Sequence, residues 1–350
     1  PELKHFEAGI VLQAYLPDAL GAMQRLATFA EHRVADGGAG IKVRLVKGAN
    51  LAMETVHAEV AGWPKVTCSS KTATDANYKL VLHWLLDREN MRGLRVGVAG
   101  HNLFDIAFAH LLSQSRGVSD RVEFEMLQGM ATEQAEVLSA DVGRLLLYVP
   151  TVKPKEFDVA ISYLVRRLEE NAASENFMSG IFELAPGSAM YRREAGRFRD
   201  AVNELARILT ADGHEAPRPN DHQNRALEAD RTGFDASLPL PAFTNEPDTN
   251  AALPANQEWA RAAIATATPE WLAEQSVPAG LAETDVDELV ARARAGAAAW
   301  SARPASERAA ILYRTADILA SRRGHLASIA AAEAGKAVAP GVTTDELDRI

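Results

Sequence analysis

Residues 163–171, Tyr-Leu-Val-Arg-Arg-Leu-Glu-Glu-Asn, carry side chains of types and spacing suited to binding an anion. In helical projection this stretch has two opposed faces. The apolar face follows i, i+3, i+4, i+7 spacing and consists of Ile161, Leu164, Val165 and Leu168. The polar face has the same spacing and gathers Tyr163, Arg166, Arg167 and Glu170.

The polar face has two interpretations. Arginine forks bind carboxylate or phosphate in bidentate fashion and keep their charge at any working pH. Arg166 and Arg167 can therefore form an anion clamp with Tyr163 as an aromatic wall. The plainer alternative is a solvated helix surface, which is typical of polar residues at this spacing. Other parts of the sequence are needed to choose between these two interpretations.

A second group of residues with chemical roles occupies positions 44–49, Arg-Leu-Val-Lys-Gly-Ala. Arg44 lies within an apolar strand pattern, where an unpaired charge is costly, so it must meet either a carboxylate or an electron-rich ligand. Both alternatives stay open. Gly48 follows Lys47 at the predicted strand end and suits close approach of the backbone to a ligand, because glycine lacks a Cβ.

Other strand ends carry further candidates. His101 follows a predicted strand and precedes a helix, where backbone N–H groups are free to meet an anion, although Asn102 can simply cap that helix. Lys71 either holds a phosphate or starts the next helix. Tyr148 ends a buried-looking strand and faces either a pocket or the core.

These residues must be positioned by alternating strands and helices. Strands are predicted over 9–15, 41–47, 94–98, 122–126 and 145–149, with a weaker one over 65–70, and helices over 19–35, 74–86 and 103–113. Such alternation predicts βαβ units and a parallel sheet. Polar residues at strand carboxyl ends build the active site of a βα barrel. A doubly wound sheet would bind ligands there too, but no Gly-x-Gly-x-x-Gly follows an early strand.

Length and composition exclude several classes of protein. A chain of 350 residues predicts two domains, and a net charge of -10 argues against a general nucleic-acid binder. The single cysteine, Cys68, excludes an internal disulfide framework and indicates a reducing compartment. The histidines lack metal-ligand spacing, so no metal site is predicted. No apolar run has the length of a membrane span, and the first residues do not resemble a signal peptide.

Five short motifs follow one another along the chain in a fixed order. They are Gln-Ala-Tyr at 13–15, the run at 44–49, Gly-His-Asn at 100–102, Gly-Met at 129–130 and Tyr-Leu-Val-Arg-Arg-Leu at 163–168. Together they resemble the flavin-dependent proline dehydrogenase barrel, particularly its form in the bifunctional proline utilisation (PutA) family. The resemblance implies an α/β fold in which residues 1–205 form the C-terminal portion, about five strands, of a (β/α)8 barrel. Asn50, Gly100 and Gln128 depart from the family pattern, where an aromatic residue, threonine and histidine are usual.

The resemblance implies roles for individual residues. The positions of Arg166 and Arg167 bind the carboxylate of L-proline, Tyr148 and Tyr163 shape the substrate pocket, and Arg44 lies beside the flavin N5. The positions assigned to the FAD site or its support, in addition to Arg44, are Gln13, Lys47, Gly48, Ala49, Lys71, His101 and Glu170. The implied reaction is FAD-dependent oxidation of L-proline to 1-pyrroline-5-carboxylate, with a membrane quinone as the electron acceptor.

The tail resembles a second family. Phe-Thr-Asn-Glu-Pro at 243–247 and Glu-Ala-Gly-Lys at 333–336 are similar to the start of the glutamate-semialdehyde dehydrogenase half, in the aldehyde dehydrogenase superfamily. Residues 206–255 are then predicted as a linker, and 256–350 as the helical N-terminal portion of that domain. The parent enzyme would oxidise glutamate semialdehyde to glutamate with NAD, and its nucleotide site and catalytic cysteine are expected outside this chain.

A closed barrel of this class needs eight strands, so the resemblance implies an internal stretch of a bifunctional enzyme. The family's substrate lysine and a functional aspartate are expected upstream. Two alternatives stay open: a truncated, non-catalytic fragment, or a different flavin- or phosphate-binding βα barrel. The resemblance implies a cytoplasmic protein that contacts the inner membrane peripherally. The oligomeric state, with a homo-oligomer as one alternative, and an upstream DNA-binding segment are left open.

Overall fold

The computed structural model describes residues 3–172, 176–210, 223–230, 242–275 and 283–335. The chain divides into two compact units. The first comprises Pro1–Thr55 and Lys65–Pro219, and the second comprises Val56–Pro64 and Asn220–Ile350. Each unit has its own hydrophobic core.

The first unit is built on a parallel sheet of five strands in sequential order. The strands are β1 (Ala8–Gln13), β2 (Ile41–Val46), β3 (Leu94–Ala99), β4 (Val122–Leu127) and β5 (Leu145–Tyr148). Each strand pairs with the next one along the chain, as successive βα units do in a barrel wall. The predicted α/β class and its five main strands are therefore confirmed.

The weaker strand predicted over 65–70 is wrong. This segment is irregular, and the backbone N–H of Cys68 donates to the carbonyl of Tyr15 at 2.7 Å. The segment leads into a helix that begins at Lys71, earlier than the predicted start, because the Ser70 hydroxyl caps it by accepting the N–H of Ala73 at 3.1 Å.

Helices follow each strand of the first unit. They are α1 (Ala19–Ala35), α3 (Lys71–Leu85), α4 (Leu103–Ser115), α5 (Thr132–Val142), α6 (Phe157–Ala172) and α7 (Ala189–Thr210), with short 3-10 helices η1 (Ser119–Arg121), η2 (Pro154–Glu156) and η3 (Phe177–Glu183). Helix α2 (Leu51–Ala61), which the sequence analysis did not predict, lies partly in each unit.

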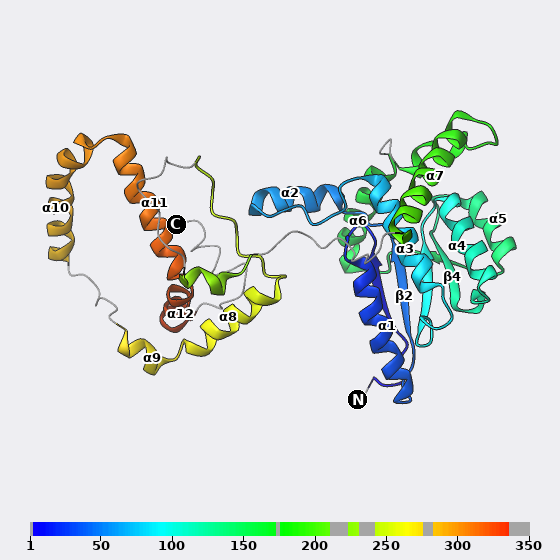
Figure 1. Cartoon of the computed structure of the whole chain (residues 1–350), viewed down its shortest axis with the longest axis horizontal. Helices are drawn as coiled ribbons and strands as arrows, with labels where there is room; N and C mark the ends of the chain where they lie inside the picture. Colours follow the sequence, from blue (N-terminus) through cyan, green and yellow to red (C-terminus); the bar gives the residue numbers. More distant parts are fainter. Residues whose placement is uncertain (1–2, 173–175, 211–222, 231–241, 276–282, 336–350) are drawn as a thin grey trace. The chain divides into compact units, whose positions relative to one another are not determined.

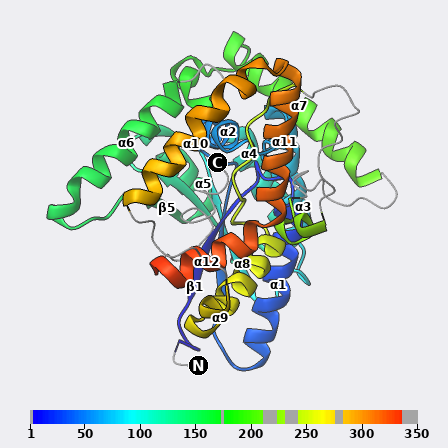
Figure 2. The same cartoon turned by 90° about the vertical axis from the view of Figure 1, so that its left-hand side faces the viewer.

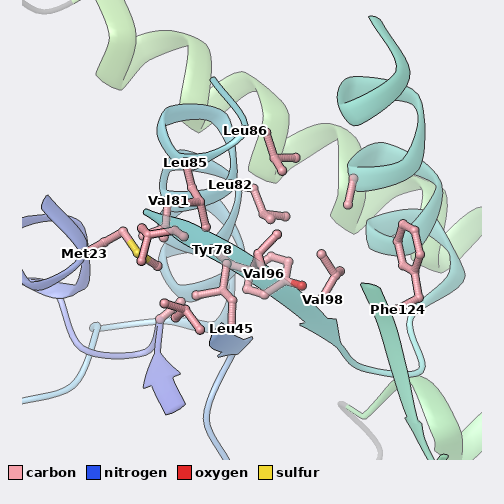
Figure 3. Close-up of a cluster of buried hydrophobic side chains, with 14 of the residues drawn as sticks. Met23, Leu45, Tyr78, Val81, Leu82, Leu85, Leu86, Val96, Val98 and Phe124 are labelled. Carbon is pink, nitrogen blue, oxygen red and sulfur yellow. The ribbon is translucent and has the colours of Figure 1, made fainter. Parts of the chain in front are cut away.

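Strand alternation separates a core face of the sheet from a polar face. Ile41, Val43 and Leu45 of β2 are buried against the helices, whereas the intervening Lys42 and Arg44 lie on the opposite face. Figure 3 shows side chains of α1, α3 and the strands interlocking on the core face. Helix α7 adds an outer layer against α3 and α4 (Figure 1), with Phe198 as an aromatic anchor.

The second unit is helical. Its helices are η4 (Arg225–Asp230), α8 (Pro254–Thr266), α9 (Pro269–Glu274), α10 (Glu283–Ala302), α11 (Ala305–Ser321) and α12 (Arg323–Ala334). Ala260, Ala263 and Ala327 form a small core between α8 and α12, which lie side by side in Figure 2. The predicted helical segment is therefore confirmed. Among the residues that the structure describes, no helix combines the length and apolar character needed to cross a bilayer.

Candidate active site

The centre of the candidate site is an ion pair on the polar face of the sheet. Arg44 is in register with Gly97 of β3, and Gly97 is in register with Glu123 of β4. Arg44 Nε donates to a carboxylate oxygen of Glu125, also on β4, and Lys42 Nζ lies 2.7 Å from the other oxygen. The predicted carboxylate partner of Arg44 is thus Glu125.

Arg44 also meets an electron-rich group. Its guanidinium carbon lies 4.5 Å from the centre of the Tyr148 ring. That ring contacts Tyr163 edge-on, with 6.4 Å between centroids, and the guanidinium of Arg167 lies 5.3 Å from the Tyr163 ring. Cations over aromatic faces are attracted by the ring quadrupole. The structure therefore brings four predicted catalytic residues into one continuous line, from β2 through the end of β5 to α6.

The remaining residues of the polar helix face are placed less centrally. Arg166 is exposed on α6, and the side chain of Glu170 lies outside the described part of the structure. The apolar stripe of the same helix is exposed too: Leu164 is 45% exposed and Leu168 63%. Much of α6 is thus exposed, although Ala160 is buried and Tyr163 and Arg167 are half-buried.

The two predicted cofactor lysines belong to a buried ionic network. Lys47 Nζ lies 2.5 Å from Asp75 and 2.6 Å from Asp105, Lys71 Nζ lies 2.8 Å from Asp75, and Lys79 Nζ lies 2.6 Å from Asp105. Burial disfavours the ionised carboxylate, but the charges of Lys47 and Lys79 outweigh it and lower the pKa of Asp105 to about 2. Burial likewise opposes the charge of Lys47, yet both aspartates raise its pKa above the ordinary value.

Gly48 and Tyr15 form the turn beside this network. Gly48 has φ of 126°, and a Cβ there would lie 2.5 Å from the Tyr15 ring. The missing Cβ at Gly48 therefore leaves room for the Tyr15 ring, and the close approach of this backbone to a ligand stays a prediction. Tyr15 donates its hydroxyl to Glu54 at 3.2 Å, and burial together with that carboxylate raises the pKa of Tyr15 to about 12. Ala49 follows the turn, and Gln13 ends β1 in register with Val46.

His101 presents an unused donor. Its Nε2 accepts the backbone N–H of Leu127 at 3.1 Å, so the proton of the neutral ring is on Nδ1. Nδ1 is buried, and no partner for it lies among the described residues. Burial lowers the pKa of His101, which keeps the ring neutral near pH 7. A buried donor of this kind is suited to a ligand acceptor. The neighbouring Asn102 caps α4 by accepting the N–H groups of Phe104 and Asp105 at 3.0 and 3.4 Å, as the plainer interpretation predicted.

Sequence reasoning missed the acidic partners. Glu123 and Glu125 alternate with apolar residues along β4, and this places both carboxylates on the face that carries Lys42 and Arg44. From this alternation, the sequence could have predicted that both carboxylates lie on one face of the sheet. Asp105 lies in the first turn of α4, where local sequence accounts for it as an ordinary helix-start acid. Asp75 lies four residues after Lys71 on α3, so the local spacing could have predicted that pair.

Comparison with known proteins gives two family matches. Residues 1–180 match the family described as "Proline dehydrogenase", and residues 262–348 match the "Aldehyde dehydrogenase family". The Bifunctional protein PutA of Escherichia coli (strain K12) is 28% identical over 366 residues, which cover 96% of this chain and 26% of that protein.

Solved structures of Proline Utilization A proteins are also similar to this chain. Proline Utilization A from Corynebacterium freiburgense is 37% identical with a TM-score of 0.66, and the match covers 99% of this chain and 31% of that one. The protein of the same name from Bdellovibrio bacteriovorus is 28% identical with a TM-score of 0.67, covering 99% and 36%. The chain spans about a quarter of the length of the curated relatives that it matches.

Proposed function

Because the chain belongs to the proline dehydrogenase family, we propose that its first unit is the substrate-clamping part of an FAD-dependent enzyme that oxidises L-proline to 1-pyrroline-5-carboxylate. Family membership implies a flavin for this part of the chain. The match of residues 262–348 to the aldehyde dehydrogenase family implies NAD(P) for the protein as a whole. We further propose that the parent protein oxidises glutamate semialdehyde to glutamate with NAD.

The observation that carries the proposal is the line of Arg44, Tyr148, Tyr163 and Arg167. It supports a pocket with a fixed cation at each end and aromatic walls between them. A small amphiphilic anion such as proline has a carboxylate for the cation of α6 and an apolar ring for the tyrosines. Arg166, next to Arg167 on the exposed helix, would complete the clamp.

The residues present fit a flavin. The buried Nδ1–H of His101 is a donor without a protein acceptor among the described residues, and flavins are rich in acceptors. Gln13, Arg44 and His101 lie on or just after three adjacent strands, toward their carboxyl ends. When bound, the flavin supplies the hydride acceptor that the protein's own side chains lack. The protein's part is to hold the proline carboxylate and fix its orientation.

The remaining predicted cofactor residues would act as supports. The ionic network ties Lys47 to α3 and α4 and joins it through Asp75 to Lys71, and Tyr15 packs against Gly48. We infer that these contacts fix the turn at 47–49, including Ala49, so that its backbone faces the cofactor. Glu170, on the polar face of α6, stays a predicted cofactor residue.

The test is anaerobic titration with L-proline of the protein in the longest form that its reading frame encodes. We expect the oxidised flavin spectrum to bleach with L-proline and to persist with D-proline at the same concentration. A protein that binds FAD but keeps its oxidised spectrum in saturating L-proline would contradict the proposed activity. Release of 1-pyrroline-5-carboxylate identifies the product.

A second candidate is that the 350-residue chain alone is a non-catalytic fragment. The observation that favours it is the open sheet, in which β1 and β5 each pair with one neighbour among the described strands. We expect this chain by itself neither to retain yellow flavin nor to reduce an acceptor dye with proline. A stable FAD spectrum with proline-dependent bleaching would overturn that expectation.

The domain boundaries and partners are proposals of the same kind. We place a linker at 206–255 and the start of the aldehyde dehydrogenase domain at 256–350. A membrane quinone would reoxidise the flavin, which implies a cytoplasmic protein with peripheral contact at the inner membrane. A homo-oligomer is compatible with this arrangement.

A further inference from the structure

We propose that Glu125 is a positioning residue, which anchors the guanidinium of Arg44 and balances its charge beside the flavin. The inference rests on the proposed function, because it assigns Arg44 to the flavin site. Glu125 lies outside the five motifs that carry the family resemblance.

The burial and the contacts of Glu125 allow it to fix the position of the Arg44 guanidinium. Its side chain is 1% exposed, whereas those of Arg44 and Lys42 are 28% and 32% exposed. One carboxylate oxygen accepts from Arg44 Nε, and the other lies 2.7 Å from Lys42 Nζ. A buried carboxylate with two cationic partners has little freedom to move.

The contact uses one end of the guanidinium. Glu125 engages Nε, and within the described part of the chain no hydrogen bond joins the terminal Nη groups of Arg44 to the protein. The planar fork is therefore fixed at its inner end and open at its outer end. The Tyr148 ring, 4.5 Å away, restricts the plane of the group on one side.

The architecture of the sheet makes this contact feasible. Arg44 and Glu125 stand on β2 and β4, with β3 between them. Gly97 of β3 lies directly in the path, and a Cβ at this position would overlap the Glu125 carboxylate. Gly100 adds a backbone link, because its N–H donates to the carbonyl of Glu125 at 3.1 Å.

The two carboxylates of this cluster each face more than one cation, because Arg144 also lies 3.1 Å from Glu123. Lys42 and Arg44 supply two positive charges, and Glu123 and Glu125 supply two negative charges. Loss of the Glu125 charge leaves Arg44 uncompensated in a site of low dielectric constant. An added positive charge beside a flavin stabilises its reduced, more negative form, so Glu125 must lower the flavin midpoint potential.

The test compares Glu125→Gln, Glu125→Ala and Glu123→Gln in the longest form that the reading frame encodes. Glu125→Gln removes the charge but keeps an oxygen acceptor for Arg44. Glu125→Ala removes both. Glu123→Gln is the matched control, because it removes the same charge from the same face at a residue that pairs with Lys42 and Arg144. The measurements are the flavin midpoint potential and the Kd for FAD.

We expect Glu125→Gln to raise the midpoint potential clearly while the Kd for FAD changes less than threefold. We expect Glu125→Ala, which also frees Arg44, to raise the Kd at least tenfold. Glu123→Gln should leave the potential near that of the wild type. An unshifted potential in Glu125→Gln, or an equal shift in Glu123→Gln, overturns the inference, and Glu125→Gln alone decides it if the alanine variant does not fold. A wild-type protein whose flavin is not reduced by L-proline refutes the proposed function instead.

Discussion

Arg44 on β2 and Glu125 on β4 form an ion pair across the strand that separates them. Neighbouring strands in a sheet are about 5 Å apart, so the two side chains must meet over the backbone of β3. Gly97 supplies the gap. The glycine is therefore as much a part of the site as the two charged residues.

Gly97→Ala should destabilise the protein by about 1–3 kcal/mol, the usual cost of an added methyl in a packed site. The new methyl would overlap the Glu125 carboxylate, which cannot retreat easily because Lys42 and Arg44 hold it. Urea unfolding followed by circular dichroism measures the effect.

Gly9→Ala is the matched control. Gly9 is on β1, and the nearest atom to a Cβ there is the Lys42 carbonyl oxygen at an ordinary 3.7 Å. We expect unfolding free energies within about 0.5 kcal/mol of the wild type. Equal losses for both glycines would show that strand propensity, and not the Arg44–Glu125 contact, sets the cost.

The sequence predicted the sheet better than it predicted the contacts on it. The strands around Val43, Val96 and Phe124 were recognised because buried parallel strands have a strong local pattern of apolar residues. Arg44 was known to need a partner, since an unpaired charge in an apolar strand is costly. Its choice of Glu125 depends on which strands lie next to each other, and local periodicity does not encode that.

The error over residues 65–70 has a similar origin. Residues 65–70 include the β-branched Val66 and Thr67, which are typical of a strand, but the segment is irregular and makes a backbone hydrogen bond to Tyr15. Lys47 and Lys71 were predicted to face a cofactor, a prediction that no observation tests. The Lys71–Asp75 pair is local, at i, i+4 spacing on α3. The contacts of Lys47 with Asp75 and Asp105 instead depend on the register of two helices relative to β2, which is a tertiary property.

Gly48→Ala tests the turn that follows β2. A residue with a side chain at φ of 126° is strained, and its Cβ would collide with the Tyr15 ring. We expect a loss of at least about 2–3 kcal/mol in the unfolding free energy, measured by urea titration. Gly117→Ala separates the two causes, because Gly117 also has a positive φ, 65°, but a Cβ there meets open space. Similar losses in the two variants would show that the Tyr15 contact contributes little.

Asp105 should contribute to acid stability. Its pKa is about 2 in the folded protein against an ordinary value of 3.8, so the folded state binds this proton less readily than the unfolded chain. The stabilisation is present above pH 3.8 and is lost as the pH falls through this window toward about 2.

Asp105→Asn should therefore flatten the dependence of unfolding free energy on pH between pH 3.8 and about 2. At neutral pH it leaves Lys47 and Lys79 short of a buried counter-charge, which costs about 3–5 kcal/mol. Asp141→Asn, at an exposed position, is the control and should follow the wild type. Parallel pH profiles for wild type and Asp105→Asn would contradict the assignment.

The polar face of α6 gives the most direct kinetic prediction. Arg166→Ala and Arg167→Ala should each raise the KM for L-proline ten- to a hundredfold, because a hydrogen-bonded charge pair contributes about 1.5–3 kcal/mol and each 1.4 kcal/mol is tenfold. FAD should remain bound, since neither arginine is among the proposed cofactor residues. Arg167→Lys should not restore binding, because an ammonium cannot reproduce a bidentate fork that also stacks on the Tyr163 ring.

Steady-state kinetics with L-proline and an acceptor dye, together with the flavin absorbance of each purified variant, decide between the two interpretations of this helix. Arg207→Ala removes an exposed arginine paired with Glu204 on α7 and controls for a general loss of surface charge. If α6 is only a solvated surface, all three alanine variants should share the wild-type KM. If it is a carboxylate clamp, the two α6 variants should differ from the control in KM while keeping the flavin. A variant that instead loses its flavin would place the arginine at the cofactor, since an interaction with substrate alone cannot change how much FAD the purified protein retains.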